Sequence, residues 1–310
     1  MESIILRESE KTENVRLKKP LISIVIPYFN QIQFAPSLCN NIETYINDDI
    51  EVLIMDDNSS DGSDLFLRNR LNQFTTVKII RQKNNVGVLR NASDGMAAAN
   101  GTYLIFSAGD DFLNPSALDS IRKHFHSQSD IYIYQGVRGA RQKLERLLET
   151  QDNISSLTLL NRKIFEAKWR DGSELLNACA TQPGFIWTQC VVFQADVAKK
   201  AGFMPDGGID DWGLWHNLAC LNTNTLLKIE ASPLILGMVS NTPASLGNDH
   251  LRQIDRQILG VIKHWAPAYK NDALINATTK KINACRGADP NYTIATLLRI
   301  AECLCNSEVN

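Results

Sequence analysis

The sequence lacks an excess of charge of either sign. Its 310 residues include 32 Lys and Arg against 34 Asp and Glu, which gives a formal net charge of -2. Proteins that bind nucleic acid generally need a basic face, because they gain affinity by displacing counterions from phosphates. The charge balance therefore argues against a nucleic-acid partner, and a phosphate-bearing ligand would have to be neutralised locally.

Long apolar runs are also missing. No segment reaches the ~20 consecutive apolar residues that a membrane-spanning helix needs, and residues 1–20 are rich in Lys, Arg and Glu. This composition argues against a signal peptide in that stretch. We therefore expect a flexible leader at residues 1–20 of a cytoplasmic protein, and we expect any contact with the inner face of a membrane to be peripheral.

Paired cysteines and regularly spaced histidines are absent too. The seven cysteines are scattered and contain no C-x-x-C pair, and the five histidines show no spacing typical of metal ligands. These spacings argue against zinc ribbons and disulfide frameworks. Hydrophobic residues make up 44% and charged residues 21% of the chain, which is typical of a globular protein.

What the sequence does contain is an alternation of short β-branched runs with segments of helical periodicity. The pattern predicts strands at residues 21–26, 51–55, 77–80, 103–106 and 131–134, and helices at 34–46, 65–74, 88–99 and 115–125. This order is typical of an α/β fold with a Rossmann-like, mostly parallel sheet flanked by helices. Such folds bind ligands beyond the carboxyl ends of their strands.

Two pairs of adjacent carboxylates follow predicted strands. Asp56-Asp57 comes after the second strand and Asp110-Asp111 after the fourth. Turn formation and helix capping explain the polar residues after Asp57 but not the doubled Asp. Both pairs should lie at one edge of the sheet, where unit charges ~4 Å apart repel by roughly 4 kcal/mol. A divalent cation completed by diphosphate oxygens and water would relieve this repulsion.

Other residues near strand ends suit a nucleotide. Pro27 and Tyr28 end the first strand, where an aromatic ring could stack on a base, although a proline also simply terminates a strand. Gly87 opens a predicted helix with Arg90 in its first turn. Helix N-termini and arginine both favour phosphate oxygens, but taken alone Arg90 is equally explained as a surface residue.

A third acidic pair lies further along the chain. Asp210-Asp211 follows two glycines and precedes Trp212 and Trp215. Helix capping explains Asp210, whereas two carboxylates before two tryptophans fit sugar recognition together with a general base.

In order and spacing, these segments resemble the nucleotide-diphospho-sugar transferases of the GT-A fold, specifically glycosyltransferase family 2. The resemblance extends from about residue 22 to residue 218. The segments that carry it are Ile26-Pro27-Tyr28-Phe29-Asn30, Asp56-Asp57-Asn58-Ser59-Ser60-Asp61-Gly62, Asn85-Val86-Gly87 with Arg90-Asn91, Asp110-Asp111 followed by Pro115, and Asp210-Asp211-Trp212.

The resemblance implies a nucleotide-sugar donor, most simply a UDP-sugar. Asp57 would accept the uracil N3–H, Arg90 would contact the diphosphate, and Asp110 would touch the ribose. Asp110 and Asp111 would also bind Mn²⁺ or Mg²⁺, although Ala108 replaces the usual upstream Asp of the Asp-x-Asp motif. The nucleotide pocket would be lined by Pro27, Tyr28 and Asn30.

The resemblance also implies an inverting transfer to a hydroxyl of a glycan or lipid-linked acceptor. Members of the family commonly act in the synthesis of cell-envelope polysaccharides. Asp211, or failing it Asp210, would be the general base, and Trp187 and Trp212 would contact the acceptor. We expect a catalytic domain at residues 21–240, with a nucleotide-binding half at 21–135 and an acceptor-binding half at 136–240. A helical extension would follow at 241–310.

Three alternatives stay open. A sugar nucleotidyltransferase should carry a Gly-rich basic loop after the first strand, which residues 27–31 lack. A receiver domain would be shorter and would place its phosphoacceptor where this chain has Arg81-Gln82-Lys83. A nucleotide-sugar-binding protein without transferase activity is the third alternative, because Ala108 weakens one expected metal ligand.

Overall fold

The computed structural model describes residues 20–124, 129–150, 157–167, 169–181, 186–202, 214–215, 217–218, 221–222 and 226–241. The expected leader and the expected C-terminal extension therefore lie outside the described residues, apart from residues 20 and 241. Asp210, Asp211 and Trp212 lie outside them as well. The predicted domain boundaries consequently stay predictions.

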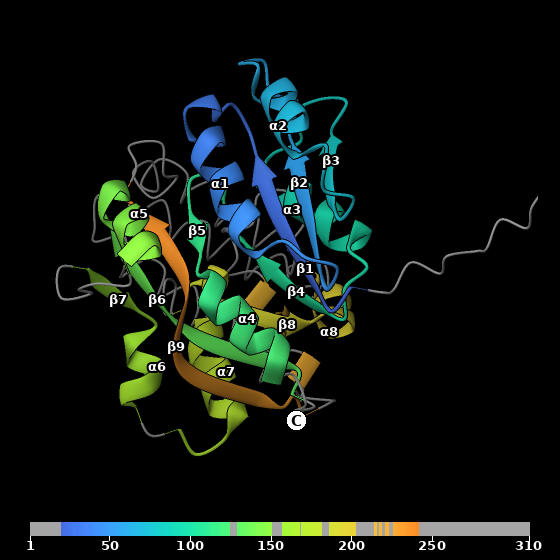
Figure 1. Cartoon of the computed structure of the whole chain (residues 1–310). Coiled ribbons are helices and arrows are strands. Elements are labelled where there is room, and N and C mark those ends of the chain that lie inside the picture. Colours follow the sequence, from blue (N-terminus) through green and yellow to red (C-terminus); the bar gives the residue numbers. More distant parts are fainter. Residues whose placement is uncertain are drawn as a thin grey trace, which may run out of the picture.

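The strands of the described residues form one nine-stranded sheet (Figure 1). Its order is β3-β2-β1-β4-β8-β6-β9-β5, and β7 pairs with β6. The strands are β1 (Ile22–Tyr28), β2 (Ile50–Asp56), β3 (Val77–Arg81), β4 (Tyr103–Phe106), β5 (Phe112–Leu113), β6 (Ile131–Gly139), β7 (Thr158–Leu160), β8 (Val191–Gln194) and β9 (Ile229–Ser240).

The first half of this sheet matches the prediction, and the second half differs from it. Strands β3, β2, β1 and β4 are mutually parallel. Strand β8, which the sequence pattern did not reveal, lies between β4 and β6 and is antiparallel to both. The α/β fold is confirmed, while the sheet as a whole is mixed rather than mostly parallel.

The four helices predicted in the first 125 residues are also present, within a few residues of their expected ends. The α-helices are α1 (Ala35–Tyr45), α2 (Ser63–Leu71), α3 (Val88–Ala98), α4 (Pro115–His124), α5 (Arg141–Thr150), α6 (Arg162–Glu166), α7 (Gly172–Thr181) and α8 (Ala195–Ala201), and two 3-10 turns are η1 (Ile32–Phe34) and η3 (Thr188–Cys190). None of the helices in the described part of the chain is long and apolar enough to cross a membrane.

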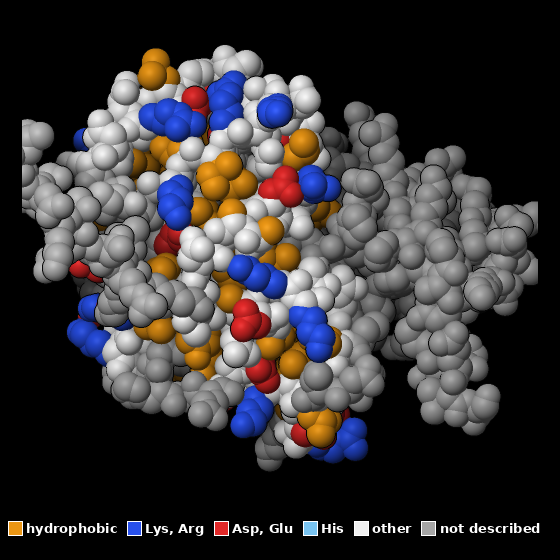
Figure 2. Space-filling model, turned by 90° about the vertical axis from the view of Figure 1, so that its right-hand side faces the viewer, with side chains coloured by type: hydrophobic (Ala, Val, Ile, Leu, Met, Phe, Trp, Pro, Cys, Tyr) orange, Lys and Arg blue, Asp and Glu red, His pale blue; other side chains and the backbone are white. Residues whose placement is uncertain are grey.

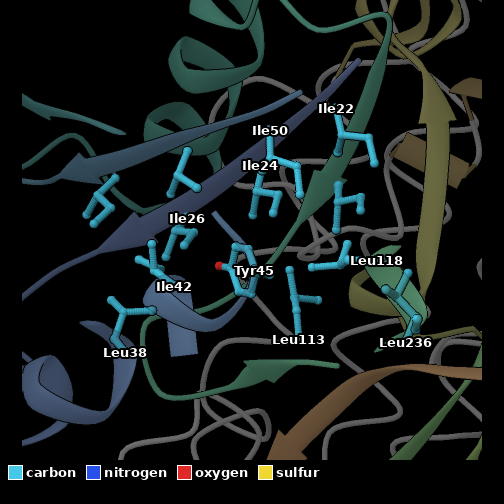
Figure 3. Packing of buried hydrophobic residues seen from close by; sticks show 14 of the residues in the cluster. Ile22, Ile24, Ile26, Leu38, Ile42, Tyr45, Ile50, Leu113, Leu118 and Leu236 are labelled. Carbon is cyan, nitrogen blue, oxygen red and sulfur yellow. The ribbon is translucent and has the colours of Figure 1, made fainter. Parts of the chain in front are cut away.

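The sheet is buried on both faces. Alternate residues of β1 point to opposite sides, so Ile24 and Ile26 pack with α1 and α4, whereas Val25 packs with α3 and α7. Figure 3 shows the first of these cores, where Ile42 of α1 and Leu118 of α4 belong to the same cluster. Burial on both faces explains why the central strands are continuously apolar.

The far end of the sheet curls back toward α1 (Figure 1). The side chain of Asn41 on α1 pairs with the backbone of β5, since its amide donates to the Leu113 carbonyl and its oxygen accepts from the Leu113 N–H, both at 2.9 Å. Leu236 of β9 joins the core on the α1 side. The curl brings the second half of the chain alongside the end of β1.

The opposite, amino-terminal edge of the sheet carries a buried polar network around Glu51. Its carboxylate accepts hydrogen bonds from Ser23 Oγ (2.6 Å), Lys78 Nζ (2.7 Å) and both the backbone N–H and side-chain amide of Asn100 (2.9 Å each). Burial alone would raise the pKa of Glu51, but these hydrogen bonds hold it below its usual value. Four segments of the chain are joined at this point.

Lys, Arg, Asp and Glu side chains are interspersed on the face shown in Figure 2. Some charged side chains of the protein form ion pairs within a single helix. Examples are Arg68–Asp64 in α2 and Arg90–Asp94 in α3, both at 2.8 Å. The mixing agrees with the near-zero net charge of the chain.

Candidate active site

The loops after β2 and β4 both lie against the carboxyl end of β1. Asp57 donates its backbone N–H to the Tyr28 carbonyl at 2.8 Å. On the other side, Gly109 packs so tightly that a Cβ there would lie 2.6 Å from Tyr28 Cδ2. Because β2 and β4 flank β1 in the sheet, the two acidic pairs follow adjacent strand ends at one edge.

Asp57 organises the loop that opens α3. The side chain is buried, and its two oxygens accept the backbone N–H groups of Val86 (2.7 Å) and Gly87 (2.9 Å). Gly87 has a φ of +85°, a conformation that favours glycine. The carboxylate therefore fixes the start of α3, and its contact with a base stays a prediction.

Asp56 is equally engaged. Its Oδ1 accepts from the Ser59 N–H at 3.2 Å, and its Oδ2 lies 3.0 Å from Arg81 Nη1. The side chain is fully buried. An ion pair with Arg81 on β3 thus compensates the burial of this carboxylate.

Asn30 joins the loops after β1 and β2. It has a φ of +49°, donates its N–H to Ser59 Oγ at 2.9 Å and accepts from the Ser60 N–H at 2.8 Å through its side-chain oxygen. Asn is among the few residues that enter the left-handed region readily. Its predicted role is to line the pocket, and its observed role is to shape the backbone there.

Tyr28 is more buried than a base-stacking residue would be. It is 2% exposed, its hydroxyl donates to the Gln31 carbonyl at 2.6 Å, and burial raises its pKa. Phe29, which follows it, is 43% exposed. Of these two rings, Phe29 offers the accessible aromatic surface at the end of β1, while Pro27 before them is half-buried.

The second acidic pair is buried as well. Asp111 is 5% exposed, accepts from the Ser240 N–H at 2.7 Å and accepts from the side-chain amide of Gln189. Burial first and the neighbouring Asp110 second raise the pKa of Asp111 to about 8, against the lowering effect of these hydrogen bonds. Asp110 is 7% exposed. Two crowded carboxylates in this position would gain from a cation.

The donor set near this pair fits a divalent cation that phosphate oxygens help to hold. Within the part of the chain that is described, His, Cys, Asp and Glu form no group of three or more that could hold a metal ion. Mg²⁺ is commonly held by one or two carboxylates together with substrate phosphates and water. Asp110 and Asp111 provide two carboxylates, so they suit a metal that arrives with a diphosphate.

Arg141, which the sequence analysis missed, supports this acidic loop. It donates to the Asp110 carbonyl at 2.7 Å and also to Ser37 Oγ. Its guanidinium lies 4.7 Å from the ring centroid of Phe34 and 4.6 Å from that of Phe112. Burial lowers its pKa. Arg141 follows the end of β6 by two residues, but the sequence pattern predicted the end of this strand at residue 134 and so gave no sign of its position.

Arg90 lies at the surface of α3. Its side chain is 65% exposed, and its Nε pairs with Asp94 on the same helix at 2.8 Å. The predicted contact with a diphosphate would require the side chain to leave this ion pair, which costs little at such exposure.

The described tryptophans of the second half have different environments. Trp215 is 1% exposed and donates to Thr188 Oγ1 at 3.0 Å, and Trp169 packs against the α3-side core. Trp187 is only half-buried, and the guanidinium of Arg138 lies 5.1 Å from its ring centroid. Trp187 therefore has surface left for an acceptor, whereas Trp215 does not.

Comparison with known proteins shows which family the chain resembles. Residues 23–171 match the sequence model described as Glycosyl transferase family 2. Abequosyltransferase RfbV of Salmonella typhimurium is 33% identical over 116 residues, which cover 36% of this chain and 35% of that protein. The match thus spans about a third of the length of this curated relative.

Solved structures agree on the fold. The mannosyltransferase PcManGT from Pyrobaculum calidifontis, in complex with GDP-Man and Mn²⁺, superposes with a TM-score of 0.54 at 12% identity, covering 94% of this chain and 87% of that chain. S. aureus TarS 1-349 in complex with UDP-GlcNAc gives a TM-score of 0.53 at 15% identity, covering 79% and 67%. The chain therefore has the GT-A glycosyltransferase fold. In sequence, its residues 23–171 resemble glycosyl transferase family 2.

Proposed function

We propose that the protein is an inverting, metal-dependent glycosyltransferase that moves a sugar from a nucleotide-diphospho-sugar to a hydroxyl of a glycan or lipid-linked acceptor. The observation that carries the proposal is the buried Asp110–Asp111 pair, which lies at the same sheet edge as the loop anchored by Asp57. The match of residues 23–171 to the family model supports the reaction class.

The donor in this proposal is a UDP-sugar. The TarS structure holds UDP-GlcNAc, whereas the mannosyltransferase structure holds GDP-Man, so the fold accepts both kinds of base. Asp57 lies at the end of β2, and each of its carboxylate oxygens accepts one backbone N–H. Since a carboxylate oxygen has a further lone pair, Asp57 can also accept the uracil N3–H. Phe29 is positioned to pack on the base.

Asp110 and Asp111 would hold the cation, Mn²⁺ or Mg²⁺. When bound, it neutralises charge that develops on the departing diphosphate. Arg141 keeps the Asp110 backbone in place by donating to its carbonyl. Arg90, released from Asp94, adds a positive charge at the N-terminus of α3, which itself favours phosphate oxygens.

Asp211 is the proposed general base, assigned from its motif because it lies outside the described residues. It takes the proton of the acceptor hydroxyl while that oxygen attacks the anomeric carbon and the bond to the diphosphate breaks. Asp210 is the substitute if Asp211 fails. One base suffices for a direct displacement, which inverts the anomeric configuration. Trp187 and Trp212 complete the proposed acceptor side.

We place this reaction in the cytoplasm or at the inner face of a membrane, acting on cell-envelope glycan precursors. Binding of the nucleotide donor can be tested without knowing the acceptor. A thermal-shift screen of UDP, GDP, CDP and dTDP with and without Mn²⁺ should show stabilisation by UDP plus Mn²⁺. Stabilisation by none of the four nucleotides would contradict the proposal.

Transfer itself is tested by incubating the protein with nucleotide sugars and Mn²⁺ and measuring free nucleoside diphosphate. Asp211→Asn should remove diphosphate release while UDP binding is retained. If release continues at a near-normal rate, the base assignment is wrong. UDP binding without release from any donor would identify a nucleotide-sugar-binding protein, and pyrophosphate release from a nucleoside triphosphate and a sugar phosphate would identify a nucleotidyltransferase.

A further inference from the structure

Arg138 carries a charge that no carboxylate of the described residues neutralises. It lies near the carboxyl end of β6, is half-buried, and donates its Nε–H to the neutral Asn241 Oδ1 at 2.8 Å. Other arginines in the described part of the chain pair with an Asp or Glu, namely Arg68, Arg70, Arg81, Arg90, Arg122, Arg141, Arg162 and Arg170. Among the described residues, Arg138 therefore differs from them in having an amide oxygen as its hydrogen-bond acceptor instead of a carboxylate.

The contacts of Arg138 leave one edge of its guanidinium available. The Trp187 ring covers one face at 5.1 Å, and Asn241 takes the Nε–H. The two terminal nitrogens have no hydrogen-bond acceptor among the described residues. These nitrogens form the planar fork that binds a carboxylate or phosphate through parallel hydrogen bonds. Stacking on Trp187 fixes the orientation of the fork.

Arg138, Trp187 and Asn241, which we call the cation platform, adjoin the acidic pair. Ser240, whose N–H donates to Asp111 at 2.7 Å, precedes Asn241 and is paired with Gly139 beside Arg138. Gln189, which also donates to Asp111, is two residues after Trp187. The platform residues are thus one or two positions away from the residues that donate hydrogen bonds to Asp111.

A surface cation–π pair would by itself contribute only about 0.5–1 kcal/mol, and it could lie anywhere on the molecule. The position near the residues that contact Asp111, the half-burial and the lack of a carboxylate partner among the described residues together indicate a ligand. The donor diphosphate is already provided with Asp110, Asp111 and Arg90 in the proposed function. The charge of Arg138 is therefore assigned to the other substrate.

We propose, on the basis of the proposed function, that the acceptor carries an anionic group, a carboxylate or a phosphate, which the terminal nitrogens of Arg138 bind. Arg138 is then a specificity-determining residue and Trp187 its support. An acceptor of the same shape that lacks the anionic group binds more weakly, because the fork is left without a partner and the guanidinium charge stays uncompensated.

The test uses simple probes, because the acceptor is unidentified. Full-length protein with ¹⁵N-labelled tryptophan is saturated with UDP and Mg²⁺, and the Trp187 indole N–H signal is assigned with Trp187→Phe. Methyl β-glucuronide is titrated against methyl β-glucoside, and glycerol 3-phosphate against glycerol. The anionic member of at least one pair should shift the Trp187 signal and bind at least ~10-fold more tightly than its neutral partner, which corresponds to about 1.4 kcal/mol.

Arg138→Gln should abolish this preference, and Arg162→Gln, a surface arginine of α6, should retain it. The pair that discriminates more strongly identifies the group as carboxylate or phosphate. No shift with either anion up to tens of millimolar, or an unchanged preference in Arg138→Gln, would overturn the inference. UDP binding is measured by thermal shift on the same samples, so that loss of nucleotide binding reveals failure of the proposed function, whereas normal UDP binding without anion preference reveals failure of this inference alone.

Discussion

The two acidic pairs at the carboxyl edge of the sheet look alike in sequence and differ in their surroundings. Asp56 forms an ion pair with Arg81, and the carboxylates of Asp56 and Asp57 together accept three backbone N–H groups. Asp110 and Asp111 are just as buried, but the pKa of Asp111 is raised to about 8 by burial and by its neighbour. The first pair therefore stabilises the fold. In the second pair, burial and the neighbouring carboxylate disfavour the charged form, and a bound cation can offset this effect.

This difference teaches how the edge is divided between structure and chemistry. Carboxylates whose hydrogen bonds come from backbone amides order the loops on which a ligand sits. Burial and mutual repulsion disfavour the charged form of two neighbouring carboxylates, and a nearby positive charge favours it. Variants of the two pairs should therefore affect different properties, and the predictions below compare them.

The largest effect is expected for Asp111→Asn, which should lower the transferase activity. Removing one buried charge should lower diphosphate release by about 100-fold, since an electrostatic contact in the active site is lost. The melting temperature of the metal-free protein should change little, because a pKa raised to about 8 leaves Asp111 largely protonated and uncharged near neutral pH. The measurement pairs a diphosphate-release assay with a thermal melt, and a large drop in melting temperature with intact activity would reverse our assignment of the second pair.

Asp57→Ala should mainly lower the stability of the folded protein. The two backbone N–H groups of Val86 and Gly87 lose a charged acceptor, which should cost about 2–3 kcal/mol of unfolding free energy. Urea denaturation measures the change. Asp94→Ala, which removes the partner of Arg90 and a hydrogen bond from the Gln82 amide at 3.0 Å, is the control and should cost about 1 kcal/mol or less. Equal losses in both variants would contradict the anchoring role of Asp57.

Glu51→Gln extends the comparison to the opposite edge of the sheet, with a smaller effect of about 1–2 kcal/mol. Because the pKa of Glu51 is lowered in the folded protein from its ordinary value of 4.5, the carboxylate stabilises the fold at pH above that value. This contribution is lost as the pH falls through the lower, folded-state pKa. Unfolding curves at several pH values should show wild type and variant converging in acid, with activity per folded molecule unchanged; a difference that persists there would contradict this account of Glu51.

The smallest structural effect is expected for Arg90→Gln. Its ion pair with Asp94 is exposed, so the unfolding free energy should change by less than about 0.5 kcal/mol. Release of diphosphate should nevertheless fall several-fold if Arg90 reaches the donor. Steady-state rates measured beside a thermal melt separate the two, and unchanged rates would leave Arg90 as a surface residue of α3.

Sequence pattern predicted the first half of the fold well, for a physical reason. In residues 20–124, local periodicity and tertiary structure agree, because β1, β2, β3 and β4 are parallel and each is followed by a helix or loop that returns over the sheet. Strand β8 was missed because its antiparallel partners β4 and β6 are distant in sequence. Antiparallel pairing of that kind leaves no local signal.

The site shows the same limit. Asp57, Asp110 and Asp111 were found because their charge conflicts with the apolar strands before them, a conflict that is visible in sequence. Arg141 was missed because its importance comes from packing between Phe34 and Phe112, which come from separate segments. Burial of Tyr28, which leaves Phe29 as the exposed ring, likewise depends on Gly109 packing against it from another loop.

The most direct test of the central claim is calorimetric titration of UDP into the protein with and without Mn²⁺, repeated with Asp110→Asn/Asp111→Asn. The account predicts that Mn²⁺ strengthens UDP binding in the wild type and has no such effect in the double variant, which should remain folded. UDP binding that is equally strong without metal, or that keeps its metal dependence in the double variant, would contradict it.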